Sequence, residues 1–95
     1  MIFEYEYTDT FAGEANYCWV KRGSVRVPEL THYGYDGSNG YSKADKAQTR
    51  ELIKRVKRAL GVSDKHVKEN YGDMIRLDFK RAGTVCFIQY SDTLN

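Results

Sequence analysis

Residues 42–61 read SKADKAQTRELIKRVKRALG, and this stretch decides the fold. Ser42 suits a helix cap, with Asp45 near the capping-box position, and Gly61 is a natural C-terminal stop. Between them an apolar stripe recurs at helical spacing, formed by Leu52, Ile53, Val56, Ala59 and Leu60. The spacing predicts one amphipathic helix over residues 42–60.

The residues before the helix alternate as strands do. Over residues 2–8, Phe3, Tyr5 and Tyr7 share one face. Residues 8–14 carry turn chemistry, and residues 15–22 form a second strand that Gly23 interrupts, which predicts an antiparallel hairpin. Residues 24–27 either extend that strand or form a short edge strand, ended by Pro28. Residues 29–41 are expected to form a loop.

The residues after the helix predict three more strands, over 65–71, 74–80 and 84–90, with residues 91–95 fraying. The order is therefore ββ-loop-αβββ. We expect an α+β fold in which a single antiparallel sheet of four to five strands carries one helix packed on one face. At 95 residues, the whole chain, 1–95, is expected to form a single domain.

The expected compartment is the cytoplasm. No apolar run approaches the roughly 18–20 residues that span a bilayer, and the alternating acidic N-terminus is unlike a secretory signal. The two cysteines, Cys18 and Cys86, stand in apolar or aromatic runs. We expect both to be buried and reduced, each in a strand.

The predicted helix carries the most distinctive charge pattern. It contains seven basic residues and only two acidic ones, Asp45 and Glu51. The net charge of the helix is therefore +5, in a chain whose net charge is +2. Five of the basic residues recur every three or four residues and are expected to share one face opposite the apolar stripe: Lys43, Lys46, Arg50, Lys54 and Lys57. Such a face suits phosphates or the acidic surface of a protein. The alternative is a solvated face that keeps the domain soluble.

Two further surfaces are candidates for binding. The loop over residues 29–41 combines Gly, Ser and Asn with Tyr33, Tyr35 and Tyr41, the residue types that paratopes favour. It is otherwise a connector whose tyrosines fold onto the sheet. The acidic N-terminal residues, which are Glu4, Glu6, Asp9 and Glu14, either mimic nucleic-acid phosphates or protect an edge strand by charge.

Nothing in the sequence predicts catalysis. His32 and His66 are far apart, neither has metal-ligand spacing with cysteines or carboxylates, and no nucleophile or phosphate-loop motif occurs. We therefore expect a binding domain, not an enzyme, with no cofactor and no metal.

Three stretches carry a resemblance to known proteins. Residues 7–20 (YTDTFAGEANYCWV), 60–62 (LGV) and 72–75 (GDMI) resemble a group of small proteins from phages and mobile elements. The resemblance implies a small accessory protein of a kind that is often an anti-defence factor, such as an anti-CRISPR protein. It implies action by binding and carries over no functional residue.

The leading hypothesis is thus a non-catalytic phage or mobile-element protein that masks a host defence component in the host cytoplasm. Its partner would be a host protein or ribonucleoprotein complex. The domain would contact it through the basic face of the helix and the tyrosine loop. The alternative is a nucleic-acid-binding domain that uses the basic helix face on phosphates. A third option is a structural phage protein with no separable site. The oligomeric state is left open.

Overall fold

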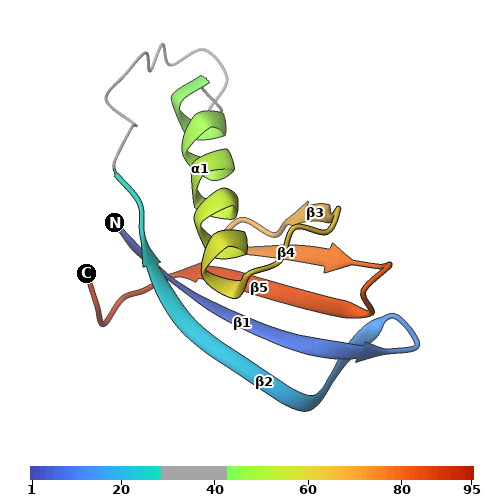
Figure 1. Cartoon of the computed structure of the whole chain (residues 1–95). Coiled ribbons are helices and arrows are strands. Elements are labelled where there is room, and N and C mark those ends of the chain that lie inside the picture. The colour runs from blue at the N-terminus through green and yellow to red at the C-terminus, as the bar shows by residue number, and fades with distance from the viewer. Residues whose placement is uncertain (29–42) are drawn as a thin grey trace.

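The computed structural model describes residues 1–28 and 43–95, without the side chains of residues 43–45. This described part contains five strands and one helix: β1 (Ile2–Phe11), β2 (Glu14–Arg26), α1 (Lys43–Leu60), β3 (Val67–Asn70), β4 (Met74–Phe79) and β5 (Thr84–Tyr90). The strands form one sheet in the order β2-β1-β5-β4-β3, with every neighbouring pair antiparallel. Figure 1 shows α1 over one face of this curved sheet. The predicted α+β fold is confirmed, whereas the predicted loop over residues 29–41 lies outside the described residues.

The core lies between α1 and the sheet. Leu52, Ile53 and Val56 of α1 are buried, as the apolar stripe predicted. They belong to one cluster with side chains of the sheet and of the segment after β2, namely Tyr7, Val27, Leu77, Phe79, Cys86 and Ile88. The stripe is shorter than expected, because Ala59 in the last turn is exposed and Leu60 is only half-buried.

The hairpin of β1 and β2 is longer than predicted. The turn occupies only Ala12 and Gly13, both with positive φ (54° and 84°), so β1 continues to Phe11. Two residues with positive φ match the twist of an antiparallel hairpin. The expected turn over residues 8–14 was therefore wrong in extent, and both strands extend well beyond the helix-covered part of the sheet (Figure 1).

Gly23 does not interrupt β2, contrary to the prediction. It pairs with Tyr5 of β1, and a Cβ placed on Gly23 would lie 2.6 Å from Cζ of the Tyr5 ring. The missing side chain thus makes room for the tyrosine across the strand pair. Gly23 is needed because of this close approach rather than to bend the chain.

The C-terminal residues, expected to fray, are tied to the first strand. The backbone N–H of Ser91 donates to the carbonyl of Ile2 at 3.0 Å. The Asn95 side chain accepts from the N–H of Ile2 at 2.7 Å and donates to its carbonyl at 2.7 Å. These bonds therefore fix the C-terminal segment against the start of β1.

Candidate functional site

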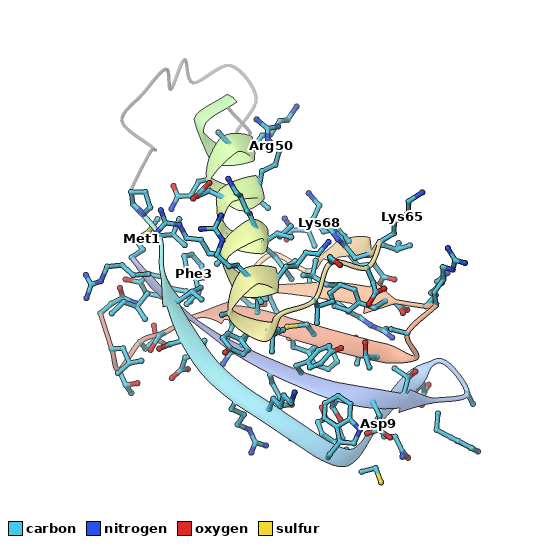
Figure 2. All side chains as sticks on the ribbon, viewed as in Figure 1. Met1, Phe3, Asp9, Arg50, Lys65 and Lys68 are labelled. Atoms are coloured by element: carbon cyan, nitrogen blue, oxygen red, sulfur yellow. The ribbon has the colours of Figure 1, made fainter. Side chains whose placement is uncertain are left out.

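Only some of the sequence-predicted site residues belong to the part of the chain that the structure describes. Tyr33, Tyr35 and Tyr41 lie outside the described residues, and Lys43 begins α1 without a described side chain. Lys46, Arg50 and Lys54 are exposed on successive turns of α1. Figure 2 shows Arg50 on the same side of the molecule as Lys65 and Lys68, which precede and belong to β3. Exposed basic side chains therefore occur both on the helix and at β3 on the edge of the sheet.

Lys57 departs from the expected solvent-facing position. It is half-buried, and its ammonium donates to the carbonyl of Asp64 at 2.8 Å and lies 5.9 Å from the ring centre of Phe79. At about 100° per residue, Lys54 and Lys57 directly follow the buried Ile53 and Val56. The basic stripe therefore lies along the flank of the buried face and not opposite to it.

A groove of about 470 Å³ follows this flank. Its helix wall comes from α1 and its other wall from the segment that leads into β3. The described lining residues are Arg50, Ile53, Lys54, Lys57, Arg58, Val62, Ser63 and His66. Four of them are basic and none carries a carboxylate, so the groove attracts anionic groups.

His66 joins the two walls of the groove. Its Nδ1 lies 3.4 Å from the Lys57 ammonium, a donor that an unprotonated Nδ1 can accept. The ring meets Phe79 edge-on, with 6.1 Å between ring centres. Partial burial, with the nearby charges of Lys57 and Lys68, holds the pKa of His66 below its ordinary value.

A second feature is a large bulge in β2. Thr8 pairs with Val20 and Thr10 with Ala15, so Asp9 alone faces four residues of β2, 16–19. Within them Tyr17 has a φ of 56°, in the left-handed region that bulky residues rarely adopt. Such a conformation persists only where surrounding contacts determine it.

Two neighbouring side chains of β1 supply those contacts. Asp9 accepts from the Asn16 side chain at 2.8 Å and from the backbone N–H of Cys18 at 2.9 Å. The buried Thr8 hydroxyl accepts from the N–H of Tyr17 at 3.1 Å and donates to the carbonyl of Trp19 at 2.8 Å. The bond from Asn16, with smaller contributions from the other donors, lowers the pKa of Asp9. Specific hydrogen bonds therefore fix the backbone of the bulge.

The bulge presents aromatic side chains. Tyr17 is 51% exposed and Trp19 is 41% exposed, while the Trp19 ring rests on the core residue Tyr7 with 5.3 Å between ring centres. Phe11 at the hairpin end is more exposed still. Sequence reasoning missed this site, since an alternating strand gave no sign of extra residues. The available signal in the sequence was the presence of Thr8, Asp9 and Asn16 around the turn, because such side chains can form hydrogen bonds with nearby backbone groups.

The two cysteines differ. Cys86 is buried in β5 as predicted, and burial raises the pKa of its thiol to about 12. The prediction was wrong for Cys18, which is exposed. Cys18 belongs to the bulge, where the regular pairing of β2 with β1 is interrupted.

Two of the four acidic N-terminal residues form interactions within the fold. Glu6 forms an ion pair with Arg22 at 3.0 Å, and Asp9 holds the bulge. β1 lies between β2 and β5, so the interpretation of these charges as edge protection was wrong for this strand. Glu4 and Glu6 border a hollow of about 650 Å³ on the sheet, which Phe87 and Tyr17 of the bulge also line.

Among the described residues, no group of three or more His, Cys, Asp or Glu side chains is arranged to hold a metal ion. In the same part of the chain, no helix has the length and apolarity needed to cross a bilayer. Comparison with family models, curated proteins and solved structures finds no match to this chain. The resemblance to phage and mobile-element proteins accordingly stays a prediction.

Proposed function

We propose that this chain is a small, non-catalytic protein-binding domain that masks a host protein. The observation that carries the proposal is the β2 bulge, on which Thr8 and Asp9 hold the backbone that presents Tyr17 and Trp19. Tyr and Trp are enriched among the residues that dominate binding energy at protein interfaces. Presenting them on an already ordered backbone lowers the entropy lost on binding.

The basic flank of α1 assists this interaction by charge. Arg50 and Lys54 are exposed on one side of the helix, and rim charges of this kind raise association rates and orient the partner. That the partner belongs to a host defence system, as a protein or ribonucleoprotein in the host cytoplasm, follows only from the sequence resemblance and is part of the proposal.

The test is affinity capture from host lysate, with and without nuclease. Wild-type protein is compared with the Tyr17→Ala/Trp19→Ala double variant and with Tyr71→Ala as a matched control. Tyr71 is 52% exposed, close to Tyr17, but lies between β3 and β4. We expect a nuclease-resistant protein partner that the control retains and the double variant loses.

Two results would contradict the proposal. If nuclease removes all captured material, the domain binds nucleic acid, which is the alternative function. If the double variant retains the partner as well as wild type does, the bulge is not the contact surface. Circular dichroism of the double variant establishes that it is folded.

A further inference from the structure

The groove beside α1 has an apolar floor beneath its basic rim. Ile53 is buried, and Val62 packs against the core from the opposite wall. Arg50 and Lys54 line the same groove. Long basic side chains commonly cover apolar surface with their methylenes while their charged ends stay in water. A ligand that fits this groove therefore needs an apolar part and negative charge on both sides of it.

We propose that the groove is a docking site for an acidic segment of the partner protein. An apolar side chain of that segment lies against Ile53 and Val62, and flanking carboxylates pair with Arg50 and Lys54. The inference rests on the proposed function, since it assigns the chemistry of the same partner, but it concerns a surface distinct from the β2 bulge.

The chemistry of the groove favours a protein segment over a nucleic acid. A phosphate backbone supplies negative charge but has no apolar side chain to cover Ile53 and Val62. Bases bind single-strand-binding surfaces chiefly by stacking on aromatic rings. Among the described lining residues, His66 carries the only ring. Carboxylates beside an aliphatic side chain match both the charge and the floor.

His66 reports on occupancy of the groove. The groups that face it are Lys57 from α1, Lys68 from β3, the Phe79 ring from β4 and, through Lys57, the carbonyl of Asp64. Both neighbouring charges are positive and disfavour the imidazolium. Carboxylates that enter the groove oppose this effect, so binding is expected to raise the pKa of His66.

The experiment titrates the purified full chain with a synthetic peptide in which a leucine is flanked by glutamates. Binding is followed by calorimetry, and the His66 ring resonances are followed by NMR across pH. We expect saturable binding and a higher pKa of His66 in the complex. The Arg50→Glu/Lys54→Glu variant is expected to weaken binding by about tenfold or more.

Lys46→Glu is the matched control. Lys46 is exposed on the same stripe of α1 but is not among the residues that line the groove. Its reversal alters net charge by the same amount per site and is expected to weaken binding by less than about threefold, through long-range charge alone. The single variants Arg50→Glu and Lys54→Glu are measured beside it. If Lys46→Glu loses as much peptide affinity as either of them, the interaction is non-specific charge attraction and the proposal is overturned.

Two comparison ligands decide the chemistry. A peptide with serine in place of leucine should bind more weakly, because the apolar floor is then uncovered; equal affinity overturns the docking of an apolar side chain. An oligothymidylate of equal charge should bind more weakly than the leucine peptide; tighter binding assigns the groove to phosphates instead. Absence of peptide binding also overturns the proposal.

The bulge variant separates this inference from the proposed function. Tyr17→Ala/Trp19→Ala should bind the peptide like wild type, because neither residue lines the groove. Loss of the captured partner with intact peptide binding supports both surfaces. Intact capture by this variant with intact peptide binding contradicts the role of the bulge and leaves the groove assignment standing.

Discussion

Asp9 in β1 accepts the backbone N–H of Cys18 in β2 at 2.9 Å, across a bulge in which one residue faces four. The carboxylate thus takes the place that a partner-strand carbonyl would have in a regular ladder. This relationship makes the display of Tyr17 and Trp19 depend on an inner strand of the sheet. Changes in β1 should therefore alter the bulge without touching its exposed side chains.

Replacement of Thr8 by valine should destabilise the domain by about 1–3 kcal/mol, because the N–H of Tyr17 and the carbonyl of Trp19 lose their shared hydroxyl at a buried position. Urea unfolding measures the change. Thr10→Val, the same substitution on the same strand, is the control and should cost less. Equal costs for the two variants would show that the Thr8 hydroxyl does not support the bulge.

Acid should loosen the bulge through Asp9. Its pKa is lowered in the folded chain by the bond from Asn16, whereas an unfolded Asp titrates near about 3.9. The stabilisation is therefore complete above the unfolded pKa and is lost as pH falls through the lower folded pKa. Fluorescence of Trp19, the single tryptophan, follows the change. In Asp9→Ala this acid transition should be absent; an unchanged transition would assign it to another carboxyl group.

Gly23→Ala should destabilise the domain by about 1–3 kcal/mol, because the new methyl group overlaps the Tyr5 ring. Thermal unfolding measures the loss. Combining it with Tyr5→Leu should recover part of the stability, as expected for two residues in contact. Strictly additive losses in the double variant would mean that the overlap with Tyr5 is not the cause.

The two thiols should differ in reactivity. A thiol reagent added to native protein should modify Cys18 quickly and Cys86 only on unfolding, because Cys86 is buried and its pKa is raised to about 12. Mass spectrometry after brief labelling identifies the modified site. The Cys18→Ser variant should be nearly inert under the same conditions, and rapid labelling of that variant would contradict the burial of Cys86.

Lys57→Met should raise the pKa of His66, since it removes one neighbouring positive charge and keeps an apolar stem beside Phe79. In wild type the folded pKa lies below the unfolded value of about 6.5. The contribution of His66 to stability is therefore present above about pH 6.5 and is lost as pH falls through the folded pKa. NMR titration gives both values. An unchanged pKa in Lys57→Met would show that the Lys57 charge does not lower it, leaving burial and Lys68 as the causes.

Local pattern was sufficient for much of the fold. The 3.6-residue spacing of Leu52, Ile53 and Val56 predicted α1, and alternation at Ile75, Leu77 and Phe79 predicted β4. These signals are strong because each element buries one face, so the period of its apolar residues follows from its own geometry. The class, the order of elements and the basic helix were therefore readable from the chain alone.

The tertiary structure decided what depends on pairing between distant residues. The exposure of Cys18, the bulge at Tyr17 and the need for glycine at position 23 all follow from the register between β1 and β2, which periodicity does not specify. The groove likewise exists only because the segment before β3 returns alongside α1 and brings His66 to Lys57. Sequence determined which surfaces each element has, and chain packing determined which of those surfaces meet.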